Sequence, residues 1–420
     1  MAVCEILSVG TEILLGDILN TNSKYLSQKL AAMGISVLRH TTVGDNPERL
    51  AAALNTALGR SDIVIATGGL GPTDDDITKE VCCEVMGFEL IPDSAIADEI
   101  RRFFEARGSV MPENNLKQAL VPLGGTVFNN RNGTAPGIGL KKDGKCIMIL
   151  PGPPYEMAPM FEEYAPTFLG EYSEGVIVSH TVRTMGIGES AMAQVVADLL
   201  ESENPTVAPY AKKGEALLRV TAKAANEAEA EKMLKPLTDE IRSRLGETVY
   251  GIDSESIEER TVELLKENNL TLATAESCTA GYISKRITDV PGASKIFGYG
   301  AVTYSNEIKE KMLGVSHETL VAHGAVSAET AAEMAAGVRR VSGSDIGISV
   351  TGIAGPGSDG TDKPVGLCYI AIDTEDFKAC EKVETGRKDR EYNRYVNASR
   401  ALNLVRLYIE RKRGSKDEFK

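Results

Sequence analysis

The chain has 420 residues, of which 42% are hydrophobic and 25% charged, and its formal net charge is −14. This composition is typical of a globular protein of two or three domains. The acidic balance argues against unspecific nucleic-acid binding, because contacts to phosphate need a basic face. No apolar run reaches the length of a membrane span, so we expect no membrane partner.

The cysteines and the first residues indicate the compartment. Seven cysteines are an odd number, and their spacing matches no metal site, which favours reduced thiols. The first ten residues carry no basic leader and are typical of a buried strand. We therefore expect a cytoplasmic protein.

Strands and helices alternate in the first third of the chain. Apolar runs over 2–9, 35–43 and 61–67 predict strands, and the patterns of 21–33 and 47–59 predict helices. Gly34 and Pro47 are typical end and start signals for the two helices. This alternation predicts an α/β domain whose mainly parallel sheet is covered on both faces.

The stretch Thr67–Asp76 carries the chemistry of this domain, because α/β sheets bind ligands at the carboxyl ends of their strands. Glycines let the backbone approach a phosphate, and carboxylates hold a hard cation that bridges a pyrophosphate. The alternative is a helix-capping aspartate among solvated charges. The expected phosphate-binding residues are Gly68, Gly69, Gly71 and Thr73, and the expected metal ligands are Asp74, Asp76, Glu12 and Asp45.

Residues from about 175 to 252 differ in character from what precedes them. Their strands and helices predict a small α+β module of about eighty residues. A KH domain that binds nucleic acid needs a GXXG loop with basic flanks, which this stretch lacks. We interpret the module as a spacer or a dimerising domain.

The last third is organised around Leu272–Gly281, an apolar run that ends in small polar residues and is followed by a helical pattern. This order predicts a strand, a tight turn and a helix, with Ser277 at unpaired backbone N–H groups. A hydroxyl there acts as a nucleophile when a base lies nearby. The alternative is that Ser277 only caps the helix.

Features further along the chain favour a nucleophile. Tyr304 and Lys309 are candidate bases, a strand over 346–350 runs into a glycine-rich turn, and a basic stretch follows from Arg387. Together they suit hydrolysis of a small phosphorylated substrate. A lysine base must have a depressed pKa, because an ordinary lysine is charged. The expected substrate-binding residues are Thr279, Gly281, Thr351, Gly352, Gly355, Arg390 and Arg394.

These motifs resemble a known family. Ala275–Gly281, Tyr304, Lys309 and Ser349–Pro356 resemble the C-terminal domain of the CinA family (competence/damage-inducible protein). The resemblance implies a nicotinamide mononucleotide deamidase, with Ser277 as nucleophile, Lys309 or Tyr304 as base, and no cofactor. Thr67–Asp76 and Leu150–Pro154 resemble the molybdopterin-binding domain family.

In CinA proteins that N-terminal domain implies a divalent-metal-dependent ADP-ribose pyrophosphatase, and a KH-like module joins the two larger domains. The expected domains are therefore residues 1–172, 173–252 and 256–413, in a homodimer that binds nicotinamide mononucleotide and ADP-ribose but no nucleic acid. Two other readings stay open. One is a non-catalytic partner of the competence or DNA-damage machinery, and the other is a molybdopterin-binding protein.

Overall fold

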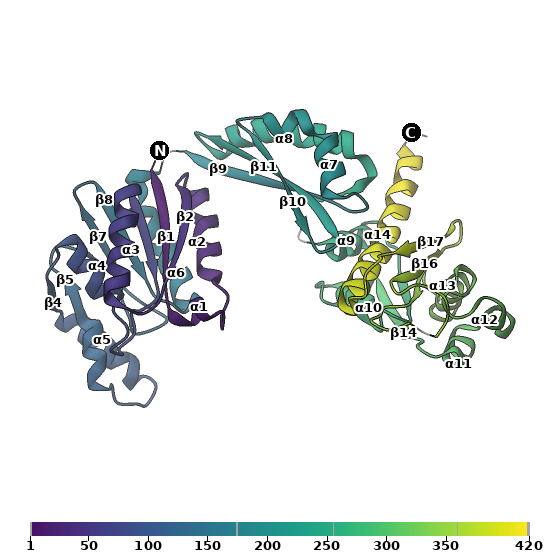
Figure 1. Cartoon of the computed structure of the whole chain (residues 1–420), viewed down its shortest axis with the longest axis horizontal. Coiled ribbons are helices and arrows are strands. Elements are labelled where there is room, and N and C mark those ends of the chain that lie inside the picture. The colour runs from purple at the N-terminus through teal and green to yellow at the C-terminus, as the bar shows by residue number, and fades with distance from the viewer. Residues whose placement is uncertain (1, 174, 255, 359, 418–420) are drawn as a thin grey trace. The chain divides into compact units, whose positions relative to one another are not determined.

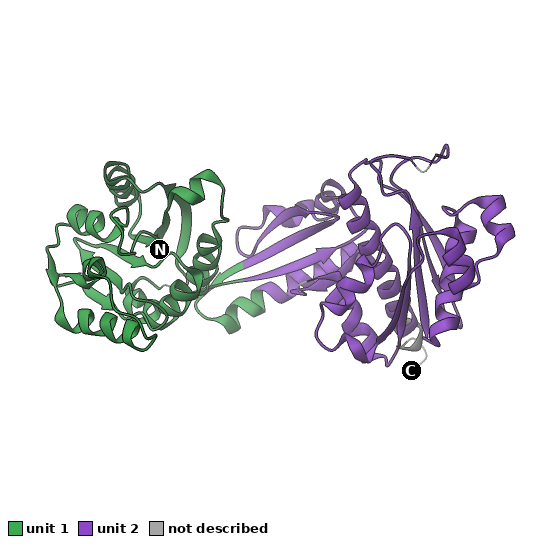
Figure 2. Ribbon diagram, turned by 90° about the horizontal axis from the view of Figure 1, so that it is seen from below, with its two compact units in different colours: residues 1–178, 222–233 green, residues 179–221, 234–420 purple. Residues whose placement is uncertain are grey.

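The computed structural model describes residues 2–173, 175–254, 256–358 and 360–417 (Figure 1). The chain folds into two compact units, one of residues 1–178 with 222–233 and the other of residues 179–221 with 234–420 (Figure 2). Helices pack on a six-stranded and a five-stranded sheet that each combine parallel and antiparallel pairs, and an antiparallel module lies between them in the sequence, so the predicted α/β class is confirmed. None of the helices in the described ranges is long and apolar enough to cross a membrane.

The first unit is built on a six-stranded sheet. Its strands, in spatial order, are β2 (Ser36–Val43), β1 (Val3–Val9), β3 (Ile63–Thr67), β8 (Lys145–Leu150), β7 (Gly137–Lys142) and β6 (Thr126–Phe128). The first four are parallel, and β7 and β6 run antiparallel to their neighbours.

Helices cover both faces of this sheet (Figure 1). Leu7 and Val9 of β1 pack with α3 (Pro47–Arg60) and α4 (Thr78–Met86). Cys4 and Ile6 point to the other face, toward α2 (Thr21–Ala32) and α6 (Pro154–Phe168). Since β1, β3 and β8 are parallel, their carboxyl ends meet at one edge of the sheet, where the connecting loops are free to form a site.

The small module has an antiparallel sheet of four strands. They are, in spatial order, β10 (Thr206–Lys212), β11 (Glu215–Ala224), β9 (Val176–Thr184) and β12 (Val249–Ile252). Its helices are α7 (Glu189–Val195) and α8 (Glu227–Leu245).

The C-terminal sheet has five strands. In spatial order they are β14 (Phe297–Val302), β13 (Leu272–Glu276), β15 (Ile346–Gly352), β16 (Leu367–Asp373) and β17 (Lys378–Glu384). The first three are parallel. One face packs on α13 (Ala328–Ser342), and the other packs on α9 (Ile257–Glu267), α10 (Tyr282–Thr288) and α14 (Arg390–Asp417).

The helix after β13 starts where the helical pattern of the sequence begins, since α10 begins at Tyr282. The buried carboxylate of Glu276 accepts hydrogen bonds from the N–H groups of Ile283 (3.0 Å) and Ser284 (2.9 Å), and so satisfies donors of the first helical turn. Ser277 is therefore not a helix cap and lies in the turn that joins the strand to the helix.

A fully buried arginine joins α14 to the small module within the second unit. The Arg406 guanidinium donates hydrogen bonds to the backbone carbonyls of Glu247 (2.7 Å) and Val249 (3.3 Å) and pairs with Glu410. One helical turn later, Arg411 pairs with the Glu247 side chain at the surface. The two arginines thus bind the same segment, one in the core and one in solvent.

We expect Arg406→Met to lower the free energy of local unfolding around β12 by about 3 kcal/mol, because the buried Val249 carbonyl and the partly buried Glu247 carbonyl lose their donor. The matched Arg411→Met should cost less than about 1 kcal/mol, as exposed ion pairs do. Hydrogen exchange of the peptide spanning 247–252 measures both. Equal protection in the two variants would contradict the role given to Arg406.

Candidate active sites

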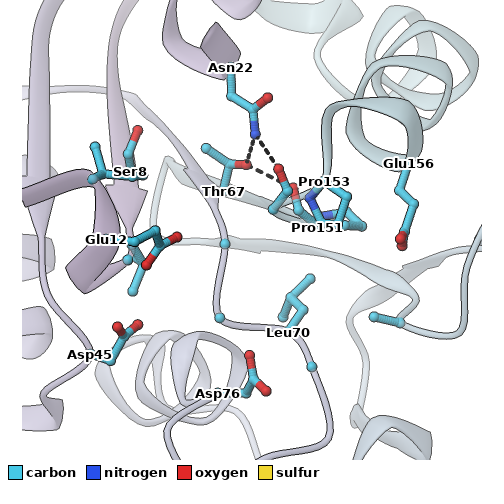
Figure 3. A pocket seen from close by; sticks show the side chains of 18 of the residues that line it. Ser8, Glu12, Asn22, Asp45, Thr67, Leu70, Asp76, Pro151, Pro153 and Glu156 are labelled. Carbon is cyan, nitrogen blue, oxygen red and sulfur yellow. Dashed lines mark hydrogen bonds between the residues drawn. The ribbon is translucent and has the colours of Figure 1, made fainter. Parts of the chain in front are cut away.

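A cavity of about 630 Å³ lies at the carboxyl ends of β1, β3 and β8 (Figure 3). The loops that follow these strands form its wall, with Gly10–Ile13 after β1, Thr67–Thr73 after β3 and Pro151–Pro154 after β8. Its volume lies within the range that encloses an organic ligand, about 300–1,000 Å³. The site thus forms where the topology brings three loops together from distant parts of the sequence.

The glycine turn after β3 requires glycine at three positions. A Cβ atom at Gly68 would lie 2.1 Å from the Val9 carbonyl oxygen, and one at Gly69 would lie 2.3 Å from Thr78 Oγ1. Both residues have positive φ angles, which other residues rarely adopt. A Cβ at Gly71 would clash with the Asp76 carboxylate. All three glycines and Thr73 line the cavity.

Asn22, which sequence reasoning missed, fixes the floor of the cavity. Its Nδ2 atom donates to Thr67 Oγ1 (3.0 Å) and to the Gly152 carbonyl (2.8 Å), and Thr67 donates in turn to the Pro151 carbonyl at 2.8 Å (Figure 3). These bonds hold the ends of β3 and β8 together. The run of polar residues before α2 was a signal, but it also fits an ordinary helix start.

The cavity is acidic. Its described lining holds five carboxylates and no lysine, arginine or histidine, and the five are Glu12, Asp45, Asp75, Asp76 and Glu156. Glu12, Asp45 and Asp76 thus line the site as predicted. Asp74 is exposed and does not line the cavity, whereas its neighbour Asp75 does. The turn orients the three aspartates differently because the Thr73 N–H donates to the Asp76 carboxylate (3.0 Å), while the single hydroxyl hydrogen of Thr73 lies between the Asp75 and Asp76 carboxylates.

The donor set fits a magnesium-like cation that arrives with phosphate. Asp45 accepts hydrogen bonds from the N–H and hydroxyl of Thr11, while the Glu12 carboxylate has no hydrogen-bond or ion-pair partner in the described chain. No three acidic, histidine or cysteine side chains among the described residues converge as a closed metal cage. Magnesium usually needs only one or two protein carboxylates, since waters and substrate phosphates supply the rest.

The second site is the turn that follows β13. The Ser277 N–H donates to the Val350 carbonyl at 2.9 Å, which fixes the residue against β15, and its side chain is nearly buried. The next two N–H groups, of Cys278 and Thr279, donate to no described atom. They are therefore available to an anionic oxygen. Ala280 and Gly281 then adopt positive φ angles, and this reversal leads the chain into α10.

Lys309 reaches this turn from a neighbouring segment. It begins a π-helical turn, Lys309–Leu313, after β14, and only 1% of its surface is exposed. Its Nζ atom lies 3.3 Å from Ser277 Oγ, 3.0 Å from the Thr303 carbonyl oxygen and 3.2 Å from the Tyr304 carbonyl oxygen. Burial lowers the pKa of Lys309 to about 8.

These three contacts suit the three donors of a charged lysine and also the two hydrogens and one lone pair of a neutral amine, and the neutral amine is the form that can act as a base. A neutral lysine has two hydrogens and one lone pair, whereas the charged form has three donors. Carbonyl oxygens only accept, so the two carbonyls take the two hydrogens. The lone pair is then left for the Ser277 hydroxyl. The geometry thus suits Lys309 as the group that receives the serine proton.

Tyr304 does not share this position. Its side chain is 60% exposed, and its hydroxyl oxygen lies 3.4 Å from Arg390 Nη2. Only its backbone carbonyl contacts Lys309. Of the three predicted catalytic residues, the structure joins Ser277 and Lys309 and turns the Tyr304 phenol toward Arg390.

Two arginines at the start of α14 are held against the loops of the site. Arg394 donates to the Thr279 carbonyl at 2.8 Å, directly behind the Ser277 turn. Arg390 donates to the Gly355 carbonyl at 2.9 Å and is exposed. Both predicted phosphate ligands thus contact backbone carbonyls of loops at this site.

The remaining predicted residues divide into two groups. Thr351 is buried and its hydroxyl donates to the Ala325 carbonyl at 2.7 Å, while a Cβ at Gly352 would lie 2.6 Å from the Leu367 carbonyl oxygen, so both fit a structural role. The Thr279 hydroxyl, in contrast, is buried and has no hydrogen-bond partner among the residues that the structure describes. The same holds for Thr303, a residue that sequence reasoning missed.

Three family models match successive parts of the chain. The probable molybdopterin binding domain matches residues 5–170, the damage-inducible protein CinA KH domain matches 179–251, and the CinA C-terminal domain matches 254–409. The order of these matches follows the order of the sheets described above.

Relatives align along most of the chain. A putative competence-damage inducible protein of Caldanaerobacter subterraneus subsp. tengcongensis is 49% identical over 97% of this chain and 98% of its own. A CinA-like protein of Dictyoglomus turgidum is 53% identical over 88% of this chain and 90% of its own.

Solved structures match a smaller part of the chain. The competence/damage inducible protein CihA from Agrobacterium tumefaciens is 35% identical, covers 37% of this chain and 93% of its own, and gives a TM-score of 0.36. The similarity to the two relatives extends over at least 88% of the chain and includes every domain described above. This chain therefore belongs to the CinA family.

Proposed function

We propose that the C-terminal domain hydrolyses the carboxamide of nicotinamide mononucleotide to nicotinate mononucleotide and ammonia. The buried contact between Ser277 and Lys309 carries this proposal, because it pairs a hydroxyl with an amine whose pKa is lowered to about 8. Arginines near the Ser277 turn suit the phosphate of the substrate.

In the first half of the proposed reaction, the Ser277 hydroxyl attacks the carboxamide carbon and passes its proton to Lys309 Nζ. The N–H groups of Cys278 and Thr279 stabilise the resulting oxyanion, each contributing about 3 kcal/mol. Lys309 then returns the proton to the departing nitrogen. The C–N bond breaks, ammonia leaves, and an ester joins Ser277 to the nicotinoyl group.

In the second half, water attacks that ester and gives a proton to Lys309. The Ser277 oxygen leaves as the C–O bond breaks and takes the proton back. The amine thus ends each cycle neutral, and no external reductant, oxidant or cofactor enters the balance. Tyr304 and Arg390, both exposed, are positioned to contact the ribose phosphate part of the substrate.

We expect Ser277→Ala and Lys309→Met each to lower kcat for ammonia release by about a thousandfold or more, because nucleophile and base act as one unit. Lys311→Met is the matched control, since this lysine lies on the same helical turn but is exposed. An ammonia-release assay on nicotinamide mononucleotide measures all three. Turnover of wild-type size in either of the first two variants would refute the assignment.

We expect kcat/KM for this reaction to rise as the pH rises toward the Lys309 pKa of about 8 and to level off above it. The sign follows because only the neutral amine accepts a proton, so the active fraction falls about tenfold per pH unit below the pKa. The variant Tyr304→Phe should keep the same profile. A profile that loses its inflection in Tyr304→Phe would make the phenol the titrating base instead.

For the N-terminal domain we propose a divalent-metal-dependent pyrophosphatase that cleaves ADP-ribose to AMP and ribose 5-phosphate. The acidic cavity supports it, because a pyrophosphate is repelled by five carboxylates unless a cation lies between them. Glu12, Asp45 and Asp76 would hold that cation. When bound, it neutralises charge on the pyrophosphate. The glycine turn offers its backbone to the phosphates.

We expect ADP-ribose cleavage to appear on addition of a divalent cation and to vanish with a chelator, while ammonia release in the same sample stays unchanged. Glu12→Gln should lower the cleavage rate about a hundredfold or more, because the cation loses a charged ligand. Asp74→Asn is the control, since Asp74 does not line the cavity. Release of AMP gives the measurement. Cleavage that persists in the presence of the chelator would sink the metal requirement.

The names of the relatives favour a second candidate, a protein of the competence or DNA-damage response without catalysis, and the family model of the first domain favours a pterin ligand. The buried Ser277–Lys309 pair argues for catalysis, since a site without activity has no need to bury a lysine amine.

We further propose a cytoplasmic homodimer in which the small module is a spacer or dimer contact. The seven unpaired cysteines support that compartment.

A further inference from the structure

One wall of the N-terminal cavity is apolar and open to solvent. Ile13, Ile18 and Leu19 line it, and the side chains of Ile18 and Leu19 are 52% and 86% exposed. Isolated exposed leucines are common and need no explanation. Here, however, two adjacent exposed apolar residues line a cavity of ligand size. The charged side chains in the described lining of the same cavity are all acidic.

The backbone that presents these side chains is fixed. At the start of the segment, the N–H and the hydroxyl of Thr11 both donate hydrogen bonds to the Asp45 carboxylate. The Asp17 N–H donates to the Glu12 carbonyl at 3.0 Å, and the Thr21 N–H donates to the Leu19 carbonyl at 2.8 Å. At its end, Asn20 caps α2 and donates to Ser8 Oγ. The exposure of Ile18 and Leu19 therefore does not come from an untethered loop.

This wall suits neither of the charged parts of the proposed substrate. A cation binds the carboxylates, and phosphates bind the cation and the glycine turn. A flat, largely uncharged ring is the chemical group that gains most from apolar side chains, because its faces leave water on contact. The volume of about 630 Å³ also leaves room for more than a pyrophosphate.

We propose that Ile18 and Leu19 form the subsite for the nucleobase of a nucleoside diphosphate substrate. This inference rests on the pyrophosphatase function proposed above. It assigns the base and the sugar phosphate of ADP-ribose to different parts of one cavity. Specificity for a nucleotide over a simple sugar diphosphate then comes from this wall.

The two products of the reaction can be used to test the two parts of the cavity separately, because AMP carries the base and ribose 5-phosphate does not. We expect Leu19→Ala to raise the inhibition constant of AMP against ADP-ribose cleavage about tenfold. The inhibition constant of ribose 5-phosphate should stay within about twofold, because that product lacks the group in question. Leu15→Ala is the matched control, as Leu15 is 73% exposed on the same segment but does not line the cavity.

A second measurement does not depend on turnover. In protein with labelled leucine methyl groups, AMP should shift the Leu19 methyl resonances through its ring current, and ribose 5-phosphate should not. The Leu15 resonances should stay in place. The Leu19→Ala variant identifies the Leu19 methyl resonances, because they are missing from its spectrum. The measurement needs no enzymatic turnover.

The possible results distinguish a failure of the base subsite from a failure of the pyrophosphatase function on which it rests. AMP inhibition that is unchanged in Leu19→Ala, with no methyl shift, overturns the base subsite alone. A wild-type protein that neither cleaves ADP-ribose nor binds either product overturns the pyrophosphatase proposal as well. If Leu15→Ala and Leu19→Ala both alter the association state in sedimentation and leave AMP inhibition unchanged, this wall contacts a second copy and the subsite is refuted.

Discussion

The enclosure of the Lys309 amine is the constraint on which the C-terminal site depends. The amine lies at the carboxyl edge of the sheet, where the pairing of β13 with β14 brings Thr303 beside Glu276. A charged ammonium is costly in such surroundings, so burial favours the neutral form. Two main-chain carbonyls then orient that neutral form. The register of two parallel strands thereby helps to lower the pKa of the Lys309 side chain.

The two sites differ in the sign of the charged side chains that they present, in a chain of strongly negative net charge. The N-terminal cavity concentrates carboxylates and leaves the compensation of charge to something that binds with the substrate. The C-terminal site supplies its own positive groups, Arg390 and Arg394, on the first turns of a helix that also packs in the core. In the functions proposed above, the first site binds its phosphorylated substrate together with a cation, and the second uses its own arginines.

Local sequence patterns predicted the class of fold and the positions of the chemical groups, but not which of them meet. Thr67–Asp76 and Leu272–Gly281 both follow strands, as their apolar runs indicated. The pattern agreed with the start of α10, but it gave no sign that the buried Glu276 carboxylate accepts hydrogen bonds from N–H groups of the first helical turn. Sequence alone treats such a residue as part of the strand.

The choice among neighbouring candidates was also outside the reach of sequence. Three consecutive aspartates look alike, and only the hydrogen bonds of Thr73 decide that Asp75 and Asp76 turn inward while Asp74 does not. Lys309 and Tyr304 were equal candidates as a base, because burial separates them and burial depends on the tertiary fold. Thr303 gave no signal, since its carbonyl makes the contact rather than its side chain.

The long helix α14 makes stabilising contacts both within the C-terminal domain and with the small module that precedes it in the sequence. Its first turns hold Arg394 against the Ser277 turn, and further along Arg406 binds main-chain oxygens on either side of Thr248, in the module that precedes the C-terminal domain. A fragment cut after the module would leave the Arg406 guanidinium with Asn403 and Glu410 as acceptors but without the carbonyls of Glu247 and Val249. The excised domain would have to hydrate or rebuild that helix before it resembled its parent.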